Sequence, residues 1–119
     1  MVKVSKILSD SSRGIQVKSP KDYIHLSRQG LSMRQMKAIL EFTGIPMKDI
    51  SNLISISDRQ LARYTDEKLL KTDVSAHLIQ ILELYKFGYE VFEDKEKFQI
   101  WMQSEIRPLD YEKPISLLD

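Results

Sequence analysis

Residues 54–64 of this 119-residue chain read ISISDRQLARY, a pattern typical of a tight turn followed by a short helix. Ser55 takes the turn position that usually holds glycine, and Ile56 is placed to fill the turn. Ser57 followed by Gln60 three residues later is a capping-box pattern, which predicts that a new helix begins there. The stretch therefore predicts the second half of a helix-turn-helix unit, with an ordinary pair of surface helices as the simpler alternative.

The residues before this stretch supply the first helix of such a unit. Pro46 suits the first turn of a helix, where its missing N–H costs nothing. Ser51 is small enough to let a second helix approach, and Leu61 is the expected inward residue of that second helix. The inward face of the first helix is predicted to hold Met47, Ile50 and Leu53.

The second helix carries the candidate DNA-binding residues. They are Ser57, Asp58, Arg59, Gln60, Arg63 and Tyr64. Arginine and glutamine side chains can pair bidentately with guanine and adenine edges in the major groove. Ser57 and the free N–H groups of the helix start suit a phosphate. Two arginines on a short helix also fit a solvated surface, so the sequence leaves DNA binding open.

Two helices are expected before the unit. The first begins near Pro20 and stops at Gly30, and Ser32 can cap the second, which Gly44 would end. The apolar face of the second helix holds Met33, Met36, Ile39 and Leu40. Residues 1–19 are rich in serine and show little periodicity, so we expect a mobile arm there.

The longest predicted helix runs from Asp73 to about Phe92. One stripe holds Val74, Leu78, Ile81, Leu82, Tyr85, Tyr89 and Phe92. Other sides hold Ile79, Leu84, Phe87 and Val91, so we expect a central, buried helix. Asp94 can cap a further helix with a buried Trp101. Beyond Glu105 two prolines predict a loop and one last turn. No segment has a strand pattern, so the predicted fold class is all-α.

Charge is distributed unevenly along the chain. Residues 1–64 contain eleven Lys/Arg and five Asp/Glu, whereas residues 65–119 contain seven and twelve. A basic half and an acidic half are typical of surfaces with different partners, and chance variation in solvated charge is the alternative. The chain has no cysteine, no apolar run of membrane-spanning length and no signal-peptide pattern. We therefore expect a cytoplasmic protein that does not enter a membrane.

The sequence argues against an enzyme. His25 and His77 are the only histidines, and neither has metal-ligand spacing. His77 lies beside the apolar stripe of the long helix, where a hydrogen-bonded imidazole at the edge of the core is the simpler interpretation. The acidic residues Glu90, Glu93, Asp94 and Glu96 fit no metal loop. We predict no catalytic residues, no cofactor and no metal.

With both halves considered, the sequence resembles the Xre/MbcA/ParS-type antitoxins over roughly residues 20–119. The first-half likeness is carried by GLSMRQMKAILEFTGIPMKDISNLISISDRQLARY, residues 30–64. The second-half pattern is a phenylalanine closing the long helix, a Trp–hydrophobic pair, a leucine and then Pro-x-x-Leu-Leu. The matching residues are Phe92, Trp101, Met102, Leu109 and Pro114 to Leu118.

This resemblance implies an Xre-like helix-turn-helix bundle at residues 20–66, followed by a long central helix and a small helical toxin-binding region at residues 67–119. It implies an antitoxin of a type II toxin–antitoxin system, which neutralises a RES-domain toxin and represses its own operon through operator DNA. Family members usually continue past the Pro-x-x-Leu-Leu segment, so the toxin-binding part is expected to be truncated at Asp119.

The expected toxin-binding residues lie near the C-terminus and are Ile106, Leu109, Tyr111, Pro114, Ile115 and Leu118. Exposed apolar residues near Ile106, Leu109, Tyr111 and Ile115 are also the first place to look for an interface between copies of the chain. A homodimer is expected, because two-fold helix-turn-helix proteins match palindromic half-sites. Two alternatives stay open: a stand-alone helix-turn-helix repressor, and an interaction module that does not bind DNA.

Overall fold

The part of the chain that the structure describes consists mainly of helices. The computed structural model describes residues 7–8, 20–104 and 113–118. The helices are α2 (Pro20–Gln29), α3 (Met33–Thr43), α4 (Met47–Ile54), α5 (Asp58–Ala62), α6 (Thr72–Phe92) and α7 (Lys95–Gln103), followed by a 3-10 turn, η3 (Pro114–Leu118). Among these residues the β-structure is an isolated antiparallel bridge between Ser32 and Leu69. The predicted all-α class is confirmed. Most of the predicted N-terminal arm lies outside the described residues.

Local sequence signals account for most helix ends. Ser32 caps α3 in a complete capping box with Gln35, and Gly44 ends this helix at φ 70°. Asp94 caps α7, because its Oδ1 accepts hydrogen bonds from the backbone N–H groups of Glu96 and Lys97 in the first turn of this helix. The sequence predicts Pro46 within the first turn of its helix, whereas in the structure it is the N-cap residue just before α4.

The start of α6 also differs by one position from the prediction. Lys71 is the N-cap residue, and Asp73 lies within the first turn. The Asp73 carboxylate accepts a hydrogen bond from Val74 N at 2.9 Å. A carboxylate in the first turn is favourable because the N-terminal end of a helix carries partial positive charge.

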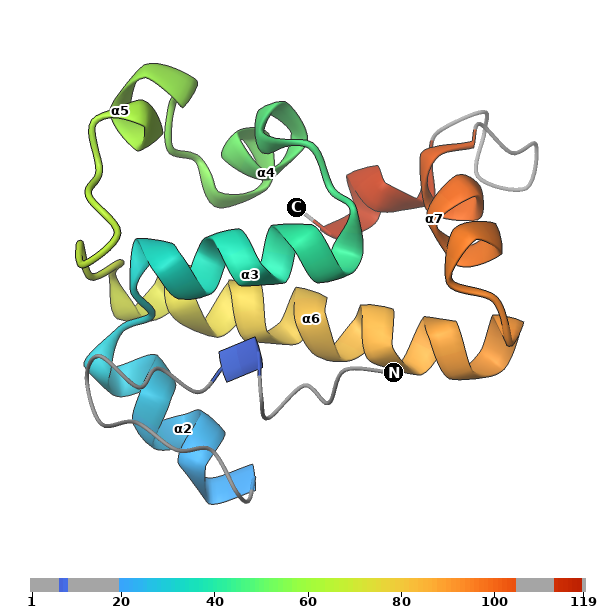
Figure 1. Cartoon of the computed structure of the whole chain (residues 1–119), viewed down its shortest axis with the longest axis horizontal. Coiled ribbons are helices and arrows are strands. Elements are labelled where there is room, and N and C mark those ends of the chain that lie inside the picture. The colour runs from blue at the N-terminus through green and yellow to red at the C-terminus, as the bar shows by residue number, and fades with distance from the viewer. Residues whose placement is uncertain (1–6, 9–19, 105–112, 119) are drawn as a thin grey trace.

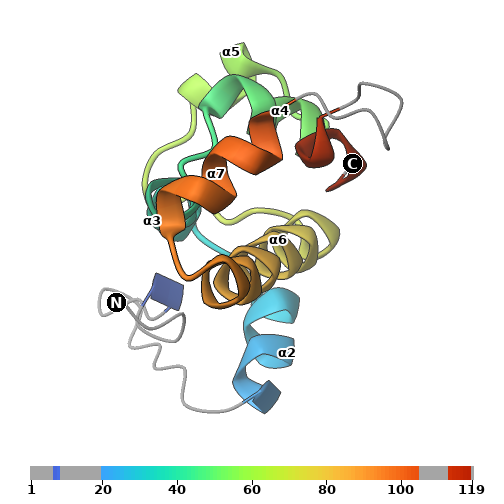
Figure 2. The same cartoon turned by 90° about the vertical axis from the view of Figure 1, so that its right-hand side faces the viewer.

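Helix α6 is the central element of the fold. Helix α2 lies on one side of it, and α3, α4 and α7 lie on the other (Figures 1 and 2). Its buried residues are Ser75, Leu78, Ile79, Ile81, Leu82, Tyr85, Gly88 and Tyr89. The expectation that α6 is buried on every side is only partly correct, because Leu84, Phe87 and Val91 are exposed at 38%, 62% and 59%. Helix α2 covers the first half of α6, and these residues belong to the second half (Figure 1).

An aromatic cluster joins α3, α6 and α7. The rings of Tyr85 and Tyr89 meet Phe98 edge-on at 5.1 and 5.7 Å. Tyr89 Oη donates to Phe42 O at 2.6 Å and accepts from Gln99 Nε2 at 2.9 Å. Burial raises the pKa of both tyrosines, so the neutral phenol is retained.

Trp101 contradicts the expectation of a buried residue. Its ring stacks on Phe98 at 6.1 Å and leans on Phe92 at 5.7 Å, yet the residue remains 38% exposed. The physical reason is its place on the outer side of α7, where it covers the aromatic cluster without being covered itself. Truncating Trp101 is therefore expected to cost less than truncating a fully buried aromatic residue.

Candidate nucleic-acid interface

Helices α4 and α5 form a compact pair joined by residues 55–57. Ser55 adopts a left-handed conformation at φ 59°, as its glycine-like position predicts. Its N–H and that of Ile56 both donate to Ser51 O, the latter at 3.1 Å. These bonds close the end of α4 in the manner of a helix C-cap and turn the chain sharply toward α5.

Ser57 begins α5 as its N-cap residue. Its Oγ accepts a hydrogen bond from Gln60 N at 3.1 Å, which is the first of the two bonds that define a capping box. The Gln60 side chain lines a neighbouring pocket instead of returning to the Ser57 backbone. The predicted start of the helix is confirmed, whereas the predicted box is half formed.

Leu61 anchors α5 to the core, and the two arginines lie on the opposite face. Leu61 is 2% exposed, and both Arg59 and Arg63 are exposed. The arginines are four residues apart, which places them one above the other along a helical path. Within the described residues neither guanidinium group forms a salt bridge, so both are available to an external anion. Asp58 is also exposed, at the start of the same helix.

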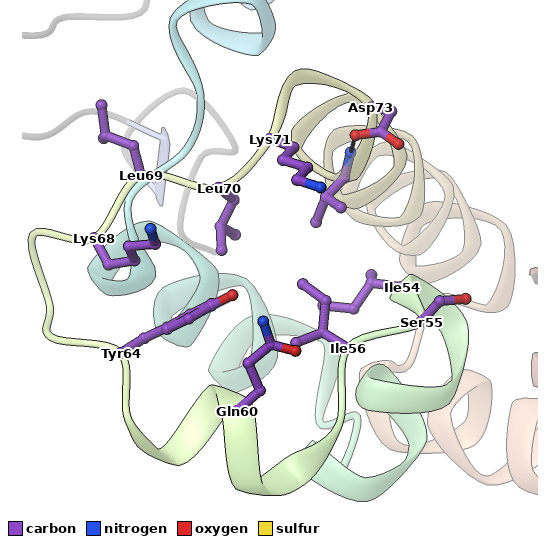
Figure 3. Close-up of a pocket in the computed structure, with 11 residues that line it drawn as sticks. Ile54, Ser55, Ile56, Gln60, Tyr64, Lys68, Leu69, Leu70, Lys71 and Asp73 are labelled. Carbon is purple, nitrogen blue, oxygen red and sulfur yellow. Dashed lines mark hydrogen bonds between the residues drawn. The ribbon is translucent and has the colours of Figure 1, made fainter.

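Two of the six candidate DNA-binding residues are directed away from this outward face. Gln60 and Tyr64 both point into the pocket between α5 and the start of α6 (Figure 3). Tyr64 is only partly exposed, and Lys68 Nζ lies 5.4 Å from the centre of its ring. Gln60 is nevertheless exposed, so the expectation of a fully outward position is wrong for Tyr64 only. Their side of α5 faces the loop that follows the helix.

This pocket has a volume of about 320 Å³. Its apolar lining includes Ile54, Ile56, Leu70 and Val74, and Lys68 and Lys71 stand at its rim (Figure 3). The sequence analysis did not identify either lysine as a site residue. The sequence does show two lysines shortly after the second helix of the pair. Only the folded loop brings them beside α5.

The acidic residues of the same loop point toward α3. Asp66 Oδ1 lies 2.7 Å from Lys37 Nζ, and Glu67 Oε1 lies 2.8 Å from Arg34 Nη2. The hydrogen bond and charge of Lys37 hold the pKa of the Asp66 carboxyl below its usual value. As a result, the loop presents its negative charges to α3 and its lysines to the pocket.

The predicted toxin-binding residues are divided by the structure. Ile106, Leu109 and Tyr111 lie outside the described residues. Pro114 is buried and Ile115 is 6% exposed, because η3 packs against α7. The expectation that Ile115 is exposed is therefore wrong.

Leu118 is partly buried against the core at the end of η3. Its carbonyl oxygen lies 2.5 Å from His77 Nε2. This hydrogen bond between the His77 side chain and a backbone carbonyl agrees with the interpretation of His77 as a residue at the edge of the core. The contact also fixes the C-terminal turn to the first half of α6.

The described residues were also compared with the requirements of a metal site and of a membrane-spanning helix, and the chain was compared with known proteins. In the parts of the chain that the structure covers, no three acidic, histidine or cysteine side chains are grouped to hold a metal ion. Among the described helices, none has the length and apolar character needed to cross a membrane. No protein-family model matches the chain, and a search of curated proteins finds no significant match.

Proposed function

We propose that this chain is a cytoplasmic DNA-binding antitoxin of a type II toxin–antitoxin system. The α4–α5 pair binds operator DNA, and the acidic second half binds and neutralises a RES-domain toxin. The observation that carries the DNA-binding part is the arrangement of α5. Leu61 holds the helix on the core while Arg59 and Arg63 extend from the opposite face without a salt-bridge partner in the described structure.

The chemistry of this face suits DNA. Exposed arginines can contact guanine edges or phosphates, and the N-terminus of α5 at Ser57 offers free N–H groups to a phosphate. The excess of basic residues in residues 1–64 adds long-range attraction to the phosphate backbone. Asp58 opposes phosphate contact, so binding is expected to depend on how Arg59 and Arg63 are placed around it.

The decisive variant for DNA binding replaces Arg59 and Arg63 by alanine. Binding to the DNA upstream of the chain's own gene would be measured by fluorescence anisotropy at several salt concentrations. We expect at least about a tenfold loss of affinity, since one specific base contact contributes roughly 1–3 kcal/mol. The affinity of this double variant for DNA should also depend less steeply on salt concentration if either arginine contacts phosphate. Lys86→Ala, an exposed change on α6, is the matched control.

An affinity that is the same in the double variant, Lys86→Ala and the unchanged protein would refute this interface. Circular dichroism would establish that the double variant is folded. Analytical ultracentrifugation would test the proposed homodimer, because a dimer of α4–α5 units is needed to match two half-sites. A monomer at the concentrations that bind DNA would exclude that arrangement.

The antitoxin part is supported by the resemblance of residues 20–119 and by the acidic second half, which suits a basic partner surface. The test is co-expression of the tagged chain with a neighbouring RES-domain reading frame, followed by purification and a toxicity assay. We expect a stable complex and restored growth, with both retained by the Arg59→Ala/Arg63→Ala variant. Free toxin and no rescue would refute the antitoxin assignment and leave a stand-alone repressor.

A further inference from the structure

The pocket beside α5 has the construction of a small-molecule site. Its floor is formed by Ile54 and Leu70, which are 6% and 5% exposed, and its walls include the half-buried Ile56 and Val74. The volume of about 320 Å³ falls at the lower end of the range of ligand pockets. An apolar floor with a few polar groups at the rim is the usual composition of such sites.

The rim of this pocket is positively charged for a structural reason. Lys68 and Lys71 are exposed and form no salt bridge with any described residue. The neighbouring acids of the loop, Asp66 and Glu67, are paired with α3 on the other side. Asp73 also lines the pocket, and its carboxylate accepts a hydrogen bond from Val74 N of its own helix while it keeps its negative charge. The two lysines therefore leave a net charge of +1 among the charged lining residues.

We propose that this pocket binds a small amphipathic carboxylate, with its apolar body on the isoleucine and leucine floor and its carboxylate between Lys68 and Lys71. Gln60 and the Tyr64 hydroxyl are placed to contribute hydrogen bonds at the same opening (Figure 3). Because Ile56 and Gln60 belong to the α4–α5 pair, the bound molecule contacts the segment that orients α5.

The test is a titration of the whole ¹⁵N-labelled chain with 3-phenylpropionate, followed by two-dimensional amide NMR. Its neutral analogue, 3-phenylpropanamide, has the same shape without the charge. We expect saturable shifts at the amides of residues 54–60 and 68–74, and about fivefold weaker binding of the amide, as two exposed charge contacts would give. The readout is binding itself, so its outcome is independent of whether the chain binds DNA.

Matched variants locate the charge contact. Lys68→Ala/Lys71→Ala is expected to weaken 3-phenylpropionate binding about fivefold and to leave 3-phenylpropanamide unchanged. Lys86→Ala, an exposed lysine away from the pocket, should change neither. The proposal is overturned if millimolar 3-phenylpropionate gives no saturable shifts, if the shifts lie elsewhere, or if the carboxylate shows no preference that depends on the two lysines.

Discussion

Asp66 and Glu67 are adjacent acidic residues whose partners both lie on α3. Each pairs with a basic residue about thirty positions earlier in the chain, Lys37 and Arg34 respectively. Both pairs are exposed, so each contributes little to the free energy of folding. They turn the two acidic side chains toward α3. The backbone of the loop is tied to the start of the same helix by hydrogen bonds from Met33 N to Lys68 O at 2.9 Å and from Arg34 N to Asp66 O at 3.0 Å.

The Asp66 pair makes a prediction about pH. Lys37 lowers the pKa of Asp66 in the folded chain below the usual 3.8. The stabilising contribution of the pair is therefore present above that usual value and is lost as pH falls through the lowered folded value. In Lys37→Ala we expect the Asp66 carboxyl to titrate higher, near its usual pKa, in an NMR pH titration.

The control for this titration is Lys86→Ala, which removes an exposed lysine elsewhere. An Asp66 pKa that stays equally low in Lys37→Ala would show that Lys37 is not its cause. The neighbouring Arg34 contributes a smaller lowering, so a small residual shift is compatible with the prediction.

The turn between α4 and α5 determines how the shorter helix is presented. Helix α5 has five residues, too few to be stable by itself in water. Its position depends on Leu61 in the core, on the Ser57 cap and on the left-handed turn at Ser55. A side chain in this conformation is strained, because its Cβ approaches the following carbonyl group.

Ser55→Gly is therefore expected to stabilise the chain. Relief of the left-handed strain gains roughly 1–2 kcal/mol, and the greater freedom of glycine in the unfolded chain offsets about 0.4–1 kcal/mol. The net expectation is a gain of about 0.5–1 kcal/mol in the free energy of unfolding, measured by urea denaturation. Ser55→Ala keeps the strain and should give no such gain. Equal stability of the two variants would contradict the argument.

A junction of three segments joins the two halves of the molecule. Leu70 N donates to Leu31 O at 2.8 Å, and Leu31 N donates to the buried Ser75 Oγ, also at 2.8 Å. Gly30 adopts φ 92° beside them, and a Cβ there would meet Leu70 O at 2.5 Å. The connection between α2 and α3 is thus held directly against the start of α6.

Ser75→Ala tests this junction. The change leaves the buried Leu31 N–H without its acceptor, which costs about 1–3 kcal/mol in the free energy of unfolding. Ser27→Ala removes the same hydroxyl from an exposed, local bond to Ile24 O and should cost far less. Comparable denaturation midpoints for the two variants would mean that the junction does not need the Ser75 hydroxyl.

Local rules explain which parts of the fold were predictable. Helix ends at Ser32, Gly44 and Asp94 depend on side chains and φ angles within a few residues, so the sequence alone locates them. The same holds for the exposure of Arg59 and Arg63, since Leu61 is the apolar residue that must face the core. Helix α2 lies along only part of α6, and no local pattern reveals which apolar residues of α6 are left exposed.

The all-α class, the order of the helices and the turn that begins α5 follow from patterns that can be read along the chain. That Gln60 and Tyr64 face a pocket, and that Ile115 is buried while Trp101 is partly exposed, depends on the packed fold. The difference lies in how far apart in sequence the interacting residues are. Caps and turns are set by neighbours in the chain, whereas these orientations depend on packing and on contacts such as Lys37 with Asp66, between residues far apart in sequence.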